Sequence, residues 1–155
     1  MKKLLLLFML LPYSFSFADI SLTPPVKNYP NLSAGISKIE IQGAPGRLSI
    51  LSPEAFSILT DTKNRVLAAG AFYGKGKAAV FTHTDFLKPS KWKKNETEKL
   101  FHQTLAWLSA QSEQKKFFIL NNKELSQYLK LKGYKTEEKS LLPAHFNEFS
   151  LLLLS

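Results

Sequence analysis

The chain has 155 residues with 21 Lys or Arg against 12 Asp or Glu, a formal net charge of +9, and 45% of its residues are hydrophobic. That length suits one domain with its own apolar core. The absence of cysteine excludes disulfides, a lipid anchor on cysteine and the cysteine nucleophile of a glutaminase. Only Arg47 and Arg65 are arginines, which disfavours specific nucleic-acid recognition, because base readout relies on arginine forks.

The N-terminus has the pattern of a secretory signal peptide. Two lysines precede the apolar run Leu4–Leu11, and Ser16-Phe17-Ala18 offers a small-x-small cleavage site. The apolar run is too short to span a bilayer, which takes about 20 residues. We therefore expect a signal peptide over residues 1–18, cleaved before Asp19, no transmembrane segment afterwards, and a periplasmic or secreted protein.

Removal of residues 1–18 leaves 19 basic and 12 acidic residues, a net charge of +7. The lysines lie in separate groups along the sequence. Such a balance is typical of a solvated, soluble surface, and it also allows attraction to an anionic envelope polymer, membrane surface or glycan. Both interpretations stay open at this point.

Residues 19–35 are rich in Pro and Asn and predict an irregular lead segment before one α/β domain over residues 36–155. The alternation over residues 36–41 is a weak strand signal, and residues 48–51 predict a short strand. Ser52 followed by Pro53 resembles a helix start, with room for a single turn.

A β-hairpin is predicted by residues 66–73 and 77–82, with Gly74-Lys75-Gly76 as its turn. Both arms are largely apolar, which predicts burial on both faces. The Gly-Lys-Gly-Lys sequence has neither the spacing of a phosphate-binding loop nor a helix after it, so the glycines are assigned to the turn.

The second half of the chain alternates helices and strands. Asn95 with Glu98 forms a capping-box pattern before a helix. Residues 116–120 predict a compact strand, and a second helix starts from Asn121 or Asn122 and ends before Gly133. The apolar stripe of the first helix consists of Leu100, Phe101, Thr104, Leu105 and Leu108, with Trp107 packing beside it.

The last elements are a weak strand near residues 136–141, a helical segment over 143–149 and a buried parallel strand at Leu151–Leu154. This order predicts an open, mostly parallel sheet flanked by helices and preceded by a β-hairpin region. A buried strand at the end of the chain leaves two alternatives. Either it packs centrally, or the chain is a shortened version of a longer protein.

Candidate site residues lie where predicted strands end. His83 and Asp85 follow the second hairpin arm, and Asn121 and Asn122 follow the strand at 116–120. Carboxyl ends of parallel strands gather at one sheet edge, where ligands bind. A His-x-Asp pair can ligate a metal or act as a base and its orienting group.

The alternative is that His83 is a structural residue that shapes the following turn. No third ligand accompanies the pair, so the sequence predicts no metal centre and no cofactor. The other two histidines, His102 and His145, are expected at the surface.

Three stretches of the sequence resemble a known family. Their matching residues are Ala55, Phe56, Ile58 and Leu59; Ala68, Ala69, Tyr73, Gly74, Lys75, Gly76, Lys77, Val80, Phe81, His83, Phe86 and Leu87; and Leu105, Trp107 and Leu108. Over about residues 35–154 the chain resembles the N-terminal domain of the enhancin-like, mucin-directed zinc metallopeptidases and of the TRP-channel-associated factors. The resemblance implies a class I glutamine amidotransferase-like (flavodoxin-like) α/β fold.

The zinc-peptidase signature H-E-x-x-H is absent from the sequence, so no zinc ligand is carried over from those enzymes. We therefore expect an exported, non-catalytic domain that binds a glycan, a cell-envelope polymer or a protein partner. The alternative is a small hydrolase or metal-dependent enzyme that uses His83 and Asp85. A concave pocket that gathers His83, Asp85 and an Asn would favour the enzyme.

Overall fold

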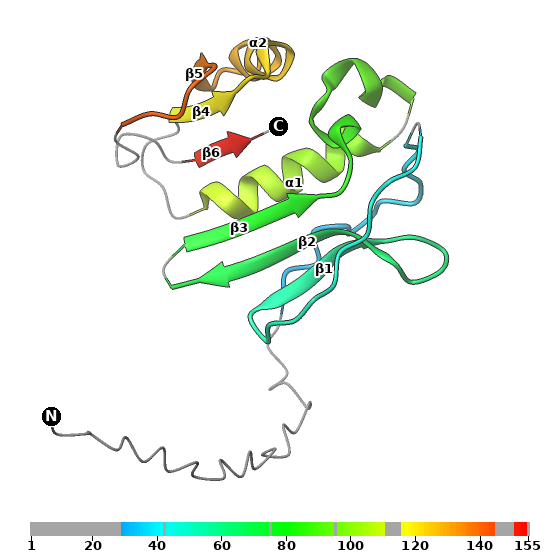
Figure 1. The fold of residues 1–155 in the computed structure, drawn as a ribbon. Helices are drawn as coiled ribbons and strands as arrows, with labels where there is room; N and C mark the ends of the chain where they lie inside the picture. The colour runs from blue at the N-terminus through cyan, green and yellow to red at the C-terminus, as the bar shows by residue number, and fades with distance from the viewer. Residues whose placement is uncertain are drawn as a thin grey trace, which may run out of the picture.

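The computed structural model describes residues 29–41, 43–74, 76–94, 96–110, 116–144 and 151–154. Figure 1 shows two sheets with helix α1 between them. The elements are β1 (Ala55–Thr60), β2 (Val66–Tyr73), β3 (Gly76–Phe81), the 3-10 helices η1 (Thr84–Leu87) and η2 (Pro89–Lys94), α1 (Thr97–Ser109), β4 (Lys116–Leu120), α2 (Lys123–Leu131), β5 (Lys135–Lys139) and β6 (Leu151–Leu154).

The first sheet is antiparallel, with strand order β1-β2-β3. The predicted hairpin is confirmed, since β2 and β3 pair from Ala68 opposite Phe81 to Tyr73 opposite Gly76. The prediction that both arms are buried on both faces is wrong for β3, where exposed and partly buried residues alternate. An antiparallel sheet can pack one face on the core and leave the other in water, and β3 does so.

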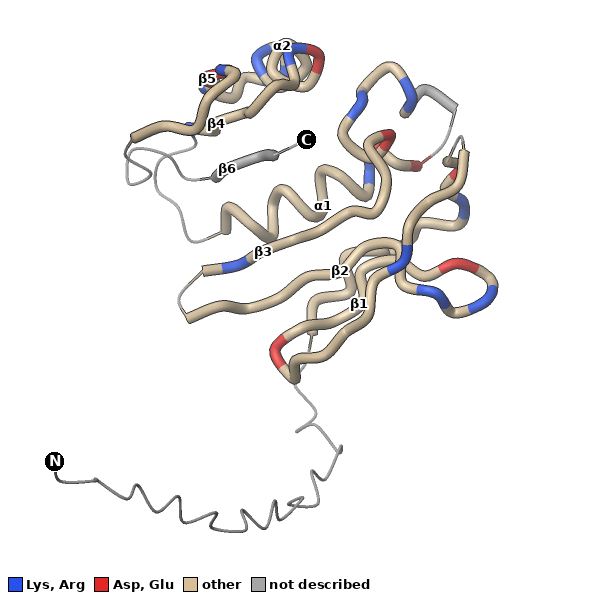
Figure 2. Tube along the Cα trace, viewed as in Figure 1, with Lys and Arg blue, Asp and Glu red and all other residues tan. Residues whose placement is uncertain are grey.

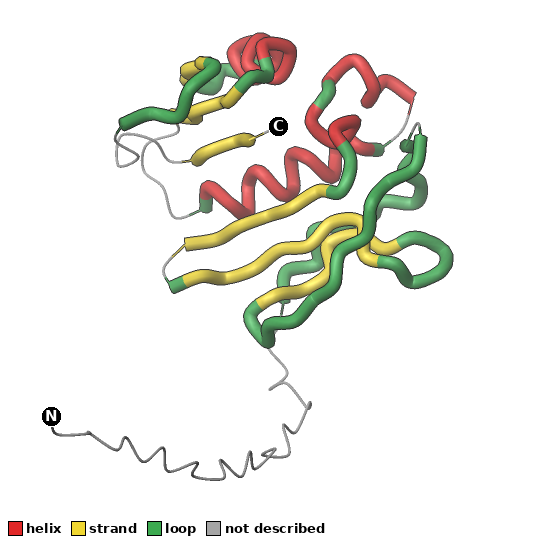
Figure 3. Tube along the Cα trace, in the orientation of Figure 1, coloured by secondary structure: helices red, strands yellow, loops and turns green. Residues whose placement is uncertain are grey.

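The second sheet is parallel, with strand order β5-β4-β6. The predicted strands at 116–120 and Leu151–Leu154 are confirmed, and Phe117 lies opposite Leu151 in the ladder. Phe117, Phe118 and Ile119 of the central strand β4 are 0% exposed. The mixed α/β class is confirmed, whereas one open, mostly parallel sheet is not, because the described strands form two separate sheets (Figure 3). One of these sheets is antiparallel and the other is parallel.

Helix α1 contributes to two apolar clusters. Leu100 packs with Phe56 and Phe86 in the cluster against the antiparallel sheet, whereas Phe101 and Leu105 pack with Phe117 of the parallel sheet. The predicted apolar stripe is therefore confirmed, and it serves both sheets. Trp107 packs edge-on against Phe56 and Phe72, with ring centroids 5.4 and 5.6 Å apart.

The predicted capping box is wrong at Glu98. The N-cap position of α1 is Glu96, which makes no side-chain cap bond. Glu98 instead accepts hydrogen bonds from Tyr128 and Lys132 of the α2 region. Asn95 lies outside the described residues. The Glu98 carboxylate, which the local pattern assigned to the cap of α1, therefore bonds to residues that are distant in the sequence.

Helix α2 follows the sequence more closely. Asn122 caps it, Leu125 and Leu129 are fully buried, and Gly133 follows the C-cap with a φ of 84°. The predicted strand near 136–141 is β5. Of the predicted helix over 143–149, Pro143 and Ala144 are non-helical and the rest lies outside the described residues.

The segment before β1 differs from its prediction. Residues 36–41 belong to no strand of the described sheets, and of residues 48–51 only Leu48 forms a bridge, to Val66. Ser52–Glu54 is a turn that leads directly into β1. Residues 36–41 form no strand because the backbone N–H groups of Ser37 and Lys38 donate to the Glu96 carboxylate. These N–H groups are therefore not free to pair with a neighbouring strand.

Candidate functional site

The structure brings His83 and Asp85 together at the start of η1. His83 is the N-cap residue, and its Nδ1 accepts a hydrogen bond from the backbone N–H of Asp85 at 3.2 Å. Nδ1 also lies 3.7 Å from Asp85 Oδ2. Because Nδ1 is the acceptor, the neutral imidazole carries its proton on Nε2. Asp85 is buried, with 8% exposure.

Asn122 lies at the opposite end of η1. Its Oδ1 accepts from Leu125 N at 2.9 Å, which caps α2, and its Nδ2 donates to Leu87 O at 3.0 Å. Asn121 is exposed, has a φ of 54°, and donates its backbone N–H to Lys139. The ends of β3 and β4 are thus linked through η1. The His83 and Asn122 side chains make hydrogen bonds to backbone groups.

Within the described ranges, no group of three or more His, Asp or Glu side chains is placed to hold a metal ion. His102, which the sequence placed at the surface, is half-buried instead. Its Nε2 lies 2.6 Å from Tyr128 Oη. His145 lies outside the described residues.

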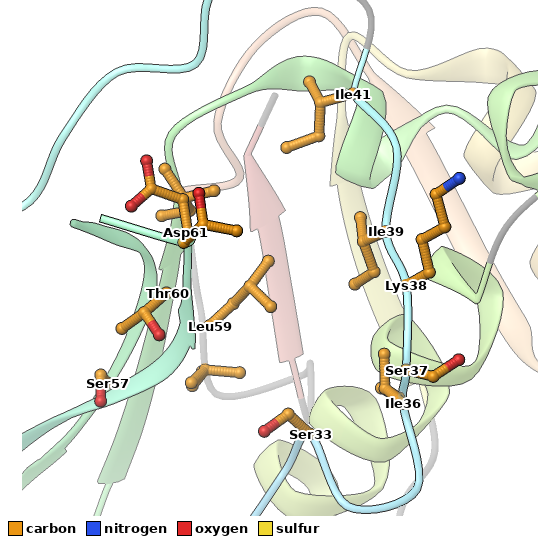
Figure 4. A pocket seen from close by; sticks show the side chains of 13 residues that line it. Ser33, Ile36, Ser37, Lys38, Ile39, Ile41, Ser57, Leu59, Thr60 and Asp61 are labelled. Atoms are coloured by element: carbon orange, nitrogen blue, oxygen red, sulfur yellow. The ribbon is translucent and has the colours of Figure 1, made fainter. Parts of the chain in front are cut away.

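A concavity lies between residues 36–41 and β1. We call it the edge pocket; it has a volume of about 540 Å³ and is lined by Ser33, Ile36, Ser37, Lys38, Ile39, Ile41, Ser57, Ile58, Leu59, Thr60, Asp61, Thr62 and Leu67. Figure 4 shows the three isoleucines along one wall and Leu59 pointing toward them from β1. The volume falls in the range of about 300–1,000 Å³ that is usual for ligand pockets.

The charged groups of the edge pocket are already paired. Lys38 Nζ lies 2.5 Å from Glu40 Oε1, and Asp61 Oδ2 lies 2.5 Å from Arg65 Nη2. Hydrogen bonds from the Arg65 side chain and backbone lower the pKa of Asp61 to about 2. The pocket therefore combines an aliphatic wall, hydroxyl groups and two paired charges, and none of its lining groups is poised to exchange a proton near neutral pH.

A second, shallower pocket of about 400 Å³ lies between η2 and α2. Beside it, Tyr128 Oη donates to Glu98 at 2.5 Å, and Lys132 Nζ lies 3.1 Å from the same carboxylate. These two contacts lower the pKa of Glu98, with the Tyr128 hydrogen bond as the larger cause. Burial, and secondarily the bond to Glu98, raises the pKa of Tyr128. Burial also lowers the pKa of His102, and Lys132 adds to that effect.

Figure 2 shows the basic residues of the described part of the chain at separate places along the backbone, with both signs on α2. None of the helices in the described ranges has the length and hydropathy to cross a bilayer. The edge pocket is therefore the better candidate site. Sequence reasoning missed it, although the apolar positions 36, 39 and 41 were its one local signal.

Comparison with known proteins places these features in a family. The family described as "TRPM8, N-terminal domain" matches residues 12–146 of the chain. A "TRPM8 channel-associated factor homolog" from Xenopus laevis is 30% identical over 90 residues. That match covers 57% of this chain and 9% of the relative's length. No solved structure matches the chain. The predicted resemblance to TRP-channel-associated factors is confirmed.

Proposed function

This chain belongs to the family of TRPM8 channel-associated factor N-terminal domains, and on that premise we propose that it is a non-catalytic interaction domain that binds a protein partner. The observation that carries the proposal is the edge pocket, a concave surface with one aliphatic wall beside the outermost described strand of a sheet. Concavities that combine apolar and polar groups serve recognition of ligands and peptide segments.

A non-catalytic role is supported by how the candidate catalytic groups are used. Nδ1 of His83 accepts a backbone N–H, so it is not available to an orienting carboxylate. Asp61 and Lys38, the charged residues of the edge pocket, are each held in an ion pair. A general base needs a free acceptor within reach of its substrate, and neither His83 Nδ1 nor the paired Asp61 carboxylate supplies one.

The finer fold that we propose is the glutamine amidotransferase-like, flavodoxin-like sheet implied by the resemblance to the enhancin-like metallopeptidases. Its support is the parallel order β5-β4-β6, with α2 as the crossover from β4 to β5. This is the order of the first three strands of a flavodoxin-like sheet, whose full order is 2-1-3-4-5.

We also propose export, with cleavage before Asp19. The support is the lysine pair, short apolar run and small-x-small site at the start of the sequence. Intact mass measurement of the chain recovered from its native host tests it. A species that starts at Asp19 supports export, and a chain that retains Met1 in the cell contradicts it.

The partner is tested by direct binding. The relative's name associates that protein with the TRPM8 channel, so purified TRPM8 in lipid nanodiscs is the first probe, with mucin glycans and peptidoglycan fragments in parallel. We expect saturable binding to the protein probe and none to the glycans. Binding to the glycans alone, or turnover of any of them, would contradict a protein-binding, non-catalytic role.

A further inference from the structure

In the described part of the chain, the β1 side of the edge pocket is a free edge of the antiparallel sheet. In the order β1-β2-β3, β1 has a strand on one side, and the described residues supply no strand on the other. Residues Ser57–Thr60 of this strand line the pocket. An uncovered strand edge carries N–H and C=O groups that can pair with another chain.

The pairing pattern shows which way the Ser57 backbone points. Phe72 N donates to Glu54 O at 3.1 Å, so that pair is hydrogen-bonded. Bonded and non-bonded pairs alternate along an antiparallel ladder, which makes Ser57 opposite Ala69 a non-bonded pair. The N–H and C=O of Ser57 therefore point away from β2, at the strand edge that borders the pocket.

The backbone of Thr60 also points away from β2, although the β1–β2 register is irregular between Ser57 and Thr60. It lies opposite Val66, whose carbonyl oxygen accepts from Leu48 on the far side of β2. Since Val66 is turned away from β1, the pair is again non-bonded, and the Thr60 backbone faces outward. The edge thus offers two backbone pairing points, and the side chains of both residues are exposed.

The opposite wall is apolar and fixed. Ile36, Ile39 and Ile41 are partly buried against the cluster around Phe56. Glu96 holds the segment through Ser37 N at 2.6 Å and Lys38 N at 2.9 Å. An occupant of the pocket therefore meets pairing groups on one side and aliphatic side chains on the other.

From this geometry we propose that the β1 edge pairs with an extended segment of the partner protein, one that alternates apolar residues with uncharged hydroxyl residues. The proposal rests on the protein-binding function proposed above and specifies how the partner is held. Backbone pairing along an exposed edge, with pockets for alternate side chains, is a recurring mode of peptide recognition. The two charged residues that line the pocket, Lys38 and Asp61, are each held in an ion pair, which favours an uncharged segment.

The test uses the purified full chain and an acetylated, amidated and uncharged peptide, Gln-Thr-Ile-Thr-Val-Thr-Ile-Thr-Gln. Ser57→Pro removes the outward N–H and keeps the β1–β2 bonds, because proline is tolerated on an edge strand where its nitrogen faces away from the ladder. Ser57→Ala is the matched control, since it loses the same hydroxyl and keeps the N–H. A second peptide, N-methylated at alternate residues, keeps every side chain but loses the backbone N–H groups along one edge of the extended peptide.

We expect the wild type and Ser57→Ala to bind the first peptide alike, and Ser57→Pro to bind about tenfold more weakly, the change produced by losing one hydrogen bond. The N-methylated peptide should lose affinity for the wild type to a similar degree. The peptide comparison decides the proposal even where Ser57→Pro fails to fold. Equal binding of both peptides, or no binding of either, would overturn it.

Two further outcomes separate this inference from the function that it rests on. If Ser57→Pro still binds the protein probe as the wild type does, the protein-binding function stands and strand pairing at β1 is wrong. If the wild type binds the peptide but no protein probe, pairing stands and the proposed partner class is wrong. Sedimentation that shows a dimer, lost in Ser57→Pro alone, would assign the edge to a second copy of the chain and overturn the proposal.

Discussion

Glu96, the residue before α1, accepts a hydrogen bond from Ser37 N at 2.6 Å, although 59 positions separate the two residues in the sequence. The same carboxylate oxygen accepts from Ser37 Oγ at 2.8 Å, and Glu96 N donates to Lys38 O at 3.4 Å. These bonds fasten the wall of the edge pocket to the start of the helix. The hydrogen bonds from Lys38 and Ser37 also lower the pKa of Glu96, with the Lys38 backbone as the largest cause.

Replacement of Glu96 by Gln should lower the thermal unfolding midpoint at neutral pH, because an amide oxygen is a weaker acceptor than a carboxylate. A carboxyl group whose pKa is lower in the folded chain stabilises it above the unfolded value, and that contribution is lost as pH falls through the folded value. The difference between wild type and variant should therefore shrink below pH 4.5, the ordinary pKa of the group. Exposed Glu138→Gln is the control, and equal midpoints for the two variants at pH 7 would contradict the prediction.

Gly70 is predicted to tolerate no side chain. A Cβ atom there would stand 2.6 Å from Phe56 Cζ. The Phe56 ring cannot retreat, because it stacks on Tyr29 with centroids 5.0 Å apart and meets Trp107 on another side. Gly70→Ala should lose about 1–3 kcal/mol of unfolding free energy through overpacking, measured by urea denaturation.

Gly46→Ala is the matched control for that change. Its Cβ would meet Thr82 at 3.5 Å, an ordinary contact, and the Gly46 backbone has no positive φ. The two alanine variants should therefore differ clearly in their urea midpoints. Equal midpoints would show that the Phe56 ring can move.

Asn122 is expected to act through two separate bonds, one that caps α2 and one that holds Leu87 O. Asn122→Ser keeps a cap acceptor and loses the second bond, at a cost of about 1 kcal/mol. Asn122→Ala loses both and should cost more, because the cap alone contributes about 0.5–2 kcal/mol. Urea midpoints of the two variants test this order, with exposed Lys123→Ala as the control; a Ser variant as unstable as the Ala variant would contradict it.

The stability of the chain should fall as the pH drops below 6.5, the ordinary pKa of histidine, through His102. Burial first, and Lys132 second, lower the pKa of this imidazole, against an opposing effect of Glu98. A folded state that binds fewer protons than the unfolded state loses stability as protons are added. Thermal midpoints measured across this range should decline for the wild type and less for His102→Gln.

The titration of Glu98 can be separated from that of His102 in the pH dependence of the thermal midpoint. Its pKa is lowered from 4.5, so its contribution is lost at lower pH than that of His102. Parallel curves for the wild type and His102→Gln between pH 7 and the onset of carboxyl titration would refute the assignment to His102. NMR titration of the imidazole gives an independent measurement of the same shift.

Local chemistry made several elements predictable. The Gly-Lys-Gly turn between two apolar runs predicted β2 and β3, and an Asn before a 3.6-residue apolar pattern predicted α2 with its cap. These elements depend on residues that are close in the sequence, so pattern and turn chemistry suffice. β4 was predicted with its observed bounds because a short apolar run flanked by polar residues has few other solutions.

The edge pocket was not predictable in the same way. Its walls come from residues 36–41 and from β1, and the first wall is held in place by Glu96 rather than by strand pairing. The same limit applied to Glu98, whose carboxylate was assigned to a helix cap and bonds to Tyr128 instead. In both cases a charge-assisted hydrogen bond to a residue distant in the sequence replaced the structure that the local pattern favoured.

By itself, the sequence determined the α/β class, the hairpin, the stripe of α1, the capped α2 and the kinship with channel-associated factors. Those features follow from apolar periodicity and turn residues, which act over one or two turns of chain. Only the tertiary structure decided that the described strands divide into two sheets, that His83 caps a 3-10 helix, and that the edge of β1 borders a pocket with one aliphatic wall. The physical reason is that local patterns are compatible with several arrangements of the same helices and strands. Long-range hydrogen bonds and the packing of α1 between the sheets stabilise one of these arrangements over the others.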